Sequence, residues 1–282
     1  MAIRPVFSAK PYYPFFEEIH VQLDWFQGFA LSQKRKSQGS LHQNYLAVYP
    51  DDKILEVSSS STEAIGYWLS AMHLSKRTPQ GFSSVETYFQ RNRIYEDADG
   101  SIIGPFPEFH SLSGKECKKR VKELAGKLHS YSYAYGDYRI PAKDYHISLF
   151  YDGVYCCSLL EPENQSICNR LLSSGYSAFS DLATTSLNSQ ARSCAIFIGI
   201  AQAGLLDELK SFEKYMRLMR TSMDGTPLTG AYDNTQPFNS KLNRVELLHP
   251  VVPQSISRDQ VISYFNEHFA HLSNSPKYIP QL

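Results

Sequence analysis

Apolar and polar residues alternate in several stretches of the chain, and these stretches predict short strands. Residues 19–25 (IHVQLDW) alternate strictly, which suits a half-buried strand, and residues 54–57 (ILEV) predict a second short strand. Residues 130–138 are aromatic and alternating, with Gly136 and Asp137 as a plausible turn, which predicts a strand or a hairpin.

Apolar spacings of three and four residues, together with capping boxes, predict more helix than strand. The predicted helices cover residues 60–73, 82–95, 113–128, 145–160, 163–174, 188–206, 207–220 and 257–272. We therefore expect a mainly helical α+β fold with a short sheet. Gly and Pro become frequent after residue 221, so we divide the chain into one compact domain, 1–220, and an extension of loop and helix, 221–282.

The stretch 82–95 (FSSVETYFQRNRIY) carries the most informative pattern in the sequence. It combines a capping box with a predicted helix that has one apolar face and one polar face. Ser83 and Glu86 have the spacing of the box. The apolar side chains expected in the core are Val85, Tyr88, Phe89 and Tyr95. Glu86, Gln90 and Arg93 are spaced i, i+4 and i+7 and share the other face. Two interpretations stay open: this stripe holds a polar, anionic ligand, or Glu86 only caps its helix and Arg93 is a solvated charge.

An acid also lies within the apolar stretch 145–160 (Asp152). A buried carboxylate is costly unless it is paired. A neighbouring hydroxyl or Arg would satisfy it, and a role in a functional site is the other explanation.

Overall composition narrows the class of protein. The 282 residues have a formal net charge of zero, which argues against non-specific coating of nucleic acid but allows a local contact to one nucleotide. No apolar run approaches the ~20 residues of a membrane span, and residues 1–16 lack the pattern of a secretory signal. The five cysteines lack metal spacing and are expected to be reduced, so we predict a cytoplasmic protein.

Common catalytic and cofactor motifs are missing from the sequence. It has no G-x-G-x-x-G after a strand, no Walker loop, no H-E-x-x-H, no C-x-x-C and no G-x-S-x-G. The histidines have no metal-ligand spacing, so no metal and no cofactor are predicted.

Three segments, in order and spacing, resemble the NADAR superfamily of NAD- and ADP-ribose-associated proteins. They are MAIRPVF with WFQGFALSQKRKSQGSLH; KILEVSSSSTEAIGYWLSAMHL with SVETYFQ; and ISLFYDGVYCCSL with SLNSQARSCAIF. The branch most similar is the one found beside DNA ADP-ribosyltransferase toxins of the DarT type. The resemblance implies a compact, mostly helical fold with an ADP-ribose pocket, removal of ADP-ribose from guanine in DNA, and a role as antitoxin to a cognate toxin.

The resemblance also implies site residues. The family's Glu and Gln correspond to Glu86 and Gln90, and its acid in the FYD-type segment corresponds to Asp152. Arg93 stands where the family has a lysine thought to form a Schiff base, and a guanidinium cannot supply that amine. Gly153 stands where relatives often have Trp, so a stacking surface is expected to be missing.

These residues suggest a mechanism in which Glu86 or Asp152 stabilises the ribosyl cation and the other protonates the base, while Arg93 grips pyrophosphate. The further ligand-binding candidates are Gln90, Ser32, Gln33, Lys36, Phe29, Tyr151 and Asn188. Lys34 is a phosphate candidate or a solvated charge, and Trp25 and Tyr88 are stacking candidates. Lys36 or Lys76 could replace the missing amine if either side chain reaches the pocket. Two alternatives remain: a non-catalytic binder that acts as reader, sensor or direct toxin inhibitor, and hydrolysis of a free nucleotide.

Overall fold

The structure, a computed structural model, describes residues 2–28, 30–124, 126–133, 138–141, 147–183 and 189–219. The strands are β1 (Ala2–Ala9), β2 (Phe16–Leu23), β3 (Ile54–Glu56), β4 (Ser75–Thr78), β5 (Gly81–Ser84), β6 (Arg93–Glu96), β7 (Ile102–Ile103), β8 (Lys127–Tyr133), β9 (Tyr138–Pro141) and β10 (Ala178–Ser180). The α-helices are α1 (Leu31–Leu46), α2 (Ala64–Trp68), α3 (Val85–Arg91), α4 (Gly114–Leu124), α5 (Ile147–Leu159), α6 (Gln165–Ser173), α7 (Gln190–Gln202) and α8 (Phe212–Met219). The short 3-10 helices are η1 (Pro107–Ser111), η3 (Pro162–Asn164) and η4 (Leu206–Lys210).

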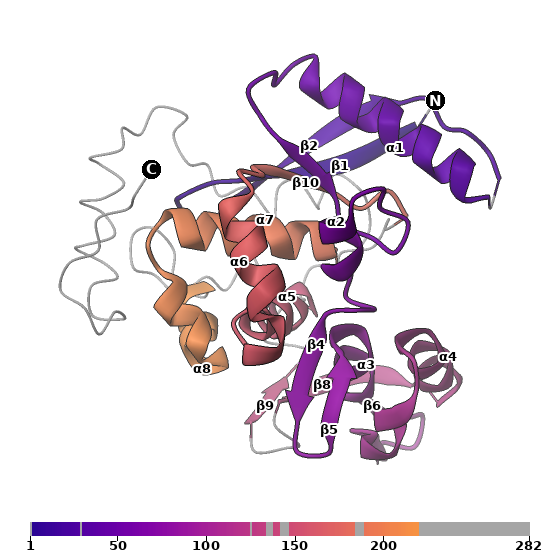
Figure 1. The fold of residues 1–282 in the computed structure, drawn as a ribbon. Helices are drawn as coiled ribbons and strands as arrows, with labels where there is room; N and C mark the ends of the chain where they lie inside the picture. Colours follow the sequence, from indigo (N-terminus) through magenta and orange to yellow (C-terminus); the bar gives the residue numbers. More distant parts are fainter. Residues whose placement is uncertain are drawn as a thin grey trace.

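One four-stranded sheet, in the order β2-β1-β10-β3, is covered on both faces (Figure 1). Successive side chains of a strand point to opposite faces. Val6 of β1 accordingly packs in a cluster with Leu41 and Tyr45 of α1, whereas its neighbour Phe7 packs in the main core with residues of α5 and α7. Helices α1 and α7 therefore lie on opposite sides of this sheet.

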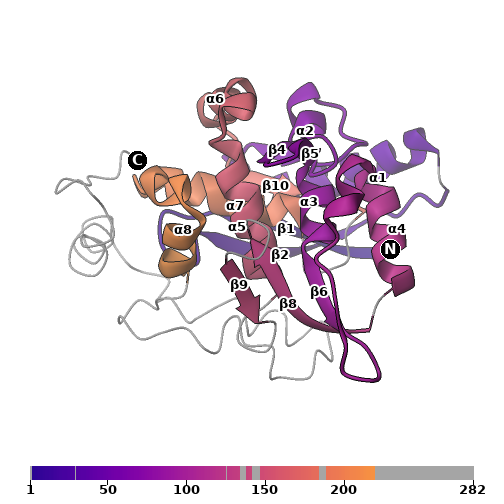
Figure 2. The same cartoon turned by 90° about the horizontal axis from the view of Figure 1, so that it is seen from below.

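A second sheet, in the order β7-β6-β8-β9, supports the other half of the molecule (Figure 2). Tyr131 of β8 stacks on Phe150 of α5, with ring centroids 4.8 Å apart. On the other face, Tyr95 of β6 packs in a small cluster with Cys117 and Val121 of α4. The strand pair β8–β9 confirms the hairpin predicted for residues 130–138; its turn lies outside the described residues.

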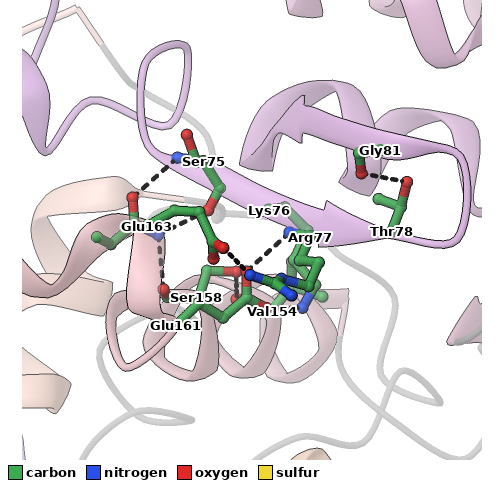
Figure 3. Close-up of polar contacts among 10 residues, drawn as sticks. Ser75, Lys76, Arg77, Thr78, Gly81, Val154, Ser158, Glu161 and Glu163 are labelled. Carbon is green, nitrogen blue, oxygen red and sulfur yellow. Dashed lines mark hydrogen bonds and ion pairs between the residues drawn. The ribbon is translucent and has the colours of Figure 1, made fainter.

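The hairpin of β4 and β5 is held against the end of α5 by polar contacts (Figure 3). Lys76 pairs with Glu161, and the backbone N–H of Arg77 donates to the same carboxylate at 2.7 Å. Arg77 also pairs with Glu163. Lys76 is thus committed to an ion pair in this hairpin, which fixes the chain segment that leads into α3.

Helices α5 and α7 are almost entirely buried, as the apolar stretches predicted. Gly153 of α5 has a specific packing role. A Cβ at this position would lie 2.6 Å from atoms of both Phe212 and Tyr215 of α8. The glycine therefore allows α8 to approach α5, and the Trp expected from the family would have no space there.

Helix starts were predicted with mixed success. The capping box of Ser113 and Glu116 is confirmed, because each residue's backbone N–H donates to the other's side chain, at 3.1 and 3.3 Å. The box at residues 60–63 is wrong: α2 begins after Glu63, whose carboxylate accepts a hydrogen bond from Tyr176 instead.

The stretch 82–95 is not one helix. Its helix, α3, covers only Val85–Arg91, and strands β5 and β6 precede and follow it. The N-cap is Ser84, whose hydroxyl accepts from the N–H of Thr87 at 3.1 Å, so the predicted box of Ser83 and Glu86 is wrong. The predicted core residues of this stretch are confirmed as buried.

The mainly helical α+β class is confirmed, although β1, β4, β5, β6, β7 and β10 were not predicted. All five cysteines are free and buried. Among the described residues, no helix has both the length and the apolar character needed to cross a membrane. The predicted extension, 221–282, lies outside the described residues.

Candidate functional site

A cavity of about 560 Å³ lies where the two halves of the fold meet. Its walls come from segments far apart in sequence: α1, the loops after β3, α2 and β10, and the helices α3, α4, α5 and α7. The described residues of its lining are Leu31, Lys34, Ser58, Ser59, Ser60, Ser70, Ala71, Met72, Glu86, Phe89, Gln90, Arg93, Lys118, Tyr151, Asp181, Ala183 and Gln190. The volume is in the range of small-molecule sites.

Three side chains of the predicted polar stripe meet in this cavity and are joined by hydrogen bonds. Nε2 of Gln90 donates to Oε1 of Glu86 at 2.9 Å, and Nη1 of Arg93 donates to Oε1 of Gln90 at 3.2 Å. Arg93 is the first residue of β6 and does not lie on the helix. The stripe was predicted from helical spacing, and the structure brings the same three residues together through a helix and the strand that follows it.

Glu86 is fixed by its surroundings as well as by Gln90. Its backbone N–H donates to the carbonyl of Ala71 at 2.9 Å, and the side-chain oxygen of Gln190 accepts from the N–H of Ala71 at 2.7 Å. The start of α4 covers the other side. A Cβ on Gly114 would lie 2.8 Å from Cγ of Glu86, so only glycine permits this approach.

Hydroxyl groups form one wall of the cavity. Ser58, Ser59 and Ser60 follow strand β3, and Ser70 lies on the segment held by Gln190. The hydroxyls of Ser58 and Ser60 are 2.9 Å apart, and Nε2 of Gln38 donates to Ser60 at 2.9 Å. Such a wall offers both donors and acceptors, which suits a sugar or another polyol.

Tyr151 also lines the cavity. Its ring meets Phe89 edge to face, with centroids 5.0 Å apart. Burial raises the pKa of Tyr151 well above its usual value, and the negative charges of Glu86 and Asp181 act in the same direction. The phenol therefore keeps its proton at neutral pH and can donate a hydrogen bond to a ligand.

Asp152 is placed differently from Glu86. It is fully buried and does not line the cavity. Its Oδ2 lies 2.8 Å from Nη2 of Arg192, and Oδ1 accepts from the hydroxyl of Ser193 at 2.6 Å. Burial raises the pKa of Asp152, while Arg192 and Ser193 oppose that shift. A neighbouring hydroxyl or Arg was one of the two explanations predicted for this buried acid, and the structure shows both. These contacts join α5 to α7.

The remaining predicted residues are divided between the cavity and other places. Lys34 and Tyr151 line the cavity. Those outside its lining are Ser32, Gln33, Lys36, Lys76, Trp25 and Tyr88. Nζ of Lys36 lies 5.9 Å from the centre of the Phe26 ring. Phe29 and Asn188 lie outside the described residues.

Several residues of the cavity were not predicted. Asp181 follows a strand that the pattern did not reveal, and Gln190 lies in the predicted helix 188–206 but was not among the candidate site residues. Lys118 comes from the charged helix α4. The run of serines after the predicted strand 54–57 was a usable signal, because loops at strand ends often carry binding residues.

Charge is distributed unevenly around the cavity. Glu86 and Asp181 are buried, with exposed fractions of 8% and 4%. Lys34 and Lys118 are exposed, and Arg93 is half-buried. The acids therefore lie deep and the cations lie toward the surface. Within the described parts of the chain, no group of three His, Cys, Asp or Glu side chains is placed to hold a metal ion.

Comparison with known proteins gives one result. The sequence model of a family described as DarT1-associated NADAR antitoxin matches residues 2–227, which is most of the chain. No curated protein matches the chain.

Proposed function

The chain belongs to the family of DarT1-associated NADAR antitoxins, and from this premise we propose that it hydrolyses the N-glycosidic bond between ADP-ribose and guanine in DNA. Removal of the adduct would reverse the modification made by a cognate toxin. The observation that carries the proposal is the cavity in which Glu86, Gln90 and Arg93 meet.

The layout of charge supports ADP-ribose as the bound group. Its pyrophosphate is anionic, and Arg93, Lys34 and Lys118 offer cations toward the surface of the cavity. Arg binds phosphate oxygens in a bidentate manner. The ribose hydroxyls would meet the serine wall. The anomeric carbon would then lie deep, beside the carboxylate of Glu86.

Glu86 supplies the chemistry in this proposal. As the ribosyl–guanine bond breaks, positive charge develops on the ribose, and a buried carboxylate stabilises it. The same carboxylate takes a proton from the water that attacks the anomeric carbon. Gln90 holds the carboxylate in position through the 2.9 Å hydrogen bond.

The mechanism needs no lysine nucleophile. Arg93 stays protonated and cannot form a Schiff base. Lys76 is paired with Glu161, and Lys36 is directed toward Phe26. We assign Lys34 and Lys118 to phosphate groups, because both are exposed at the edge of the cavity.

The helices that carry these two lysines favour DNA, rather than a free nucleotide, as the substrate. Helix α1 contains Lys34, Arg35 and Lys36 and no acid. Helix α4 contains five basic residues and two acids. The whole chain is neutral, so these helices concentrate positive charge beside the cavity, where phosphates of a DNA strand would lie.

A second function, that of a non-catalytic reader, is favoured by one observation: Arg93 replaces the lysine expected in the family. The guanidinium keeps the grip on phosphate and removes the amine. This alternative predicts tight binding of ADP-ribose without turnover.

An oligonucleotide that carries one ADP-ribosylated guanine separates these functions. Loss of the adduct, with release of free ADP-ribose, identifies a hydrolase. A retarded band with an intact adduct identifies a reader. If neither occurs and the protein forms a complex with its toxin, it acts as a direct inhibitor.

A further inference from the structure

Two further carboxyl groups lie at the ends of neighbouring parallel strands beside the cavity. Strands β3 and β10 pair in parallel, and Glu56 is the register partner of Ser180. Asp181 follows directly and lines the cavity, as do Ser58 and Ser60 after β3. In open α/β sheets, ligands bind at the carboxyl ends of the parallel strands. In this sheet only β3 and β10 pair in parallel, and the residues that follow them line the cavity.

Glu56 is buried and is surrounded by neutral hydrogen-bond donors. Its Oε2 accepts from the hydroxyl of Ser180 at 2.5 Å, and its Oε1 accepts from the N–H of Leu182 at 3.1 Å. Nε2 of His42, from α1, lies 2.8 Å from the same serine hydroxyl. Burial lowers the pKa of His42 to about 4, so this ring brings no positive charge to the pair at neutral pH.

Burial, and secondly the negative charge of Asp181, raise the pKa of Glu56 to about 8. Two interacting carboxyls of this kind titrate as a pair, and near neutrality the pair holds one proton. Glu56 therefore keeps a proton at a pH where most carboxyls are ionised, and it lies behind the lining residue Asp181 rather than in the lining itself.

Glu86 and Asp181 are the only acids in the described lining of the cavity. The charges of both raise the pKa of the Tyr151 phenol, so both lie within electrostatic reach of one side chain. Asp152 does not line the cavity, and its carboxylate is held by Arg192 and Ser193. Hydrolysis of a glycosidic bond generally uses two carboxyl groups, one beside the sugar cation and one that protonates the leaving group.

We propose that Asp181, and not Asp152, is the second catalytic carboxyl of this cavity, with buried Glu56 as a positioning residue that shares its proton. This inference rests on the proposed function. The bond between the anomeric carbon and the guanine nitrogen breaks, its electron pair goes to the nitrogen, and Asp181 donates a proton there. Water oxygen bonds to the carbon, and Glu86 accepts the proton that the water loses.

The test compares Asp181→Asn, Glu56→Gln and wild type on the oligonucleotide with one ADP-ribosylated guanine. Binding of free ADP-ribose is measured by calorimetry for each protein, and thermal unfolding checks that each is folded. Loss of a general acid lowers turnover by roughly 100- to 10,000-fold. We expect that loss of kcat for Asp181→Asn, with the Kd for ADP-ribose within about threefold of wild type as the sign of intact binding. Glu56→Gln should lower kcat less and shift the alkaline limb of its pH profile.

Each other result overturns the assignment. Turnover by Asp181→Asn close to wild type removes Asp181 from the mechanism, and a parallel loss of ADP-ribose binding makes it a binding residue only. If Asp181→Asn does not fold, the turnover of Asp181→Ser and the pH profile of Glu56→Gln test the assignment instead. An alkaline limb of kcat that is unchanged in Glu56→Gln excludes the shared proton. If wild type itself releases no ADP-ribose, the proposed function fails first and the role of Asp181 falls with it.

Discussion

Gln90 donates a hydrogen bond of 2.9 Å to the carboxylate of Glu86, one helical turn before it in α3. The amide oxygen of Gln90 in turn accepts from Arg93. This relay orients an acid that is 8% exposed at the wall of a cavity. Glu86 therefore does more than begin a helix, since Ser84 is the cap.

The close approach of Gly114 to Glu86 gives the first prediction. In Gly114→Ala the new Cβ would lie 2.8 Å from Cγ of Glu86, so the carboxylate must move. Misplacement of a catalytic group by about 1 Å costs on the order of 100-fold in rate, and we expect a 10- to 100-fold loss of ADP-ribose release. Single-turnover kinetics on the modified oligonucleotide measure it.

Gly39→Ala is the matched control for this substitution. Nothing lies within 4 Å of a Cβ at Gly39, which is in the middle of α1. This variant should keep its activity and gain about 0.5–1 kcal/mol of stability from helix propensity. Equal activity of both variants would contradict the proposed constraint on Glu86.

The buried pair of Asp152 and Arg192 gives a prediction about stability. Arg192→Met leaves a fully buried carboxylate without its guanidinium, and such a change costs about 3–5 kcal/mol. Chemical denaturation measures the loss. The control is Arg77→Ala, which removes an ion pair whose Arg side chain is 59% exposed and should cost less than about 1 kcal/mol.

The double variant Asp152→Leu with Arg192→Met separates structure from catalysis. An apolar pair of similar volume can replace a buried ion pair with little loss of stability. We expect this protein to regain most of the stability lost in Arg192→Met and still release ADP-ribose. A stable but inactive double variant would restore the catalytic role that the family resemblance gives to Asp152.

The raised pKa of Glu56 predicts how stability depends on pH. The folded protein keeps a proton on Glu56 up to about pH 8, whereas the unfolded chain loses it near 4.5. Between these values the folded state binds more protons, so this group lowers the free energy of unfolding as pH rises through the window. Denaturation at pH 5, 6.5 and 8 should show a shallower decline in Glu56→Gln than in wild type. Parallel curves for the two proteins would mean that Glu56 ionises normally.

The basic helices beside the cavity predict a preference for DNA. Lys34→Glu with Lys118→Glu should lower kcat/KM at least tenfold on the modified oligonucleotide, and the loss should shrink as salt is raised. The effect on an ADP-ribosylated mononucleoside should be smaller. Lys210→Glu is the control, because this exposed lysine at the end of η4 does not line the cavity. Equal losses on both substrates would place the two lysines on the ADP-ribose alone.

Much of this fold, and the polar stripe of the candidate site, could be predicted from the sequence. Helical spacing and apolar runs predicted α4, α5, α6 and α7, because each buries a continuous face. The polar stripe of Glu86, Gln90 and Arg93 was also found, although a strand completes it. Residues such as Asp181 could not be predicted, since β10 is three residues long and its position depends on pairing with β1 and β3.

Asp152 shows the opposite limit. An acid in an apolar helix could have been a site residue or a paired one, and the pairing depends on Arg192, forty residues away in sequence. Gly153 was interpreted as the loss of a stacking surface. The structure explains the glycine by packing, because a side chain at this position would collide with α8. Both answers required tertiary structure.

The most direct test of the central claim is the rate of ADP-ribose release by Glu86→Gln. The substitution keeps the size of the side chain and a hydrogen-bond acceptor for Gln90, and it removes the charge that stabilises the ribosyl cation. We predict that the folded variant binds ADP-ribose but releases none from the guanine oligonucleotide that wild type clears. Release at the wild-type rate would contradict the claim and exclude Glu86 from the reaction.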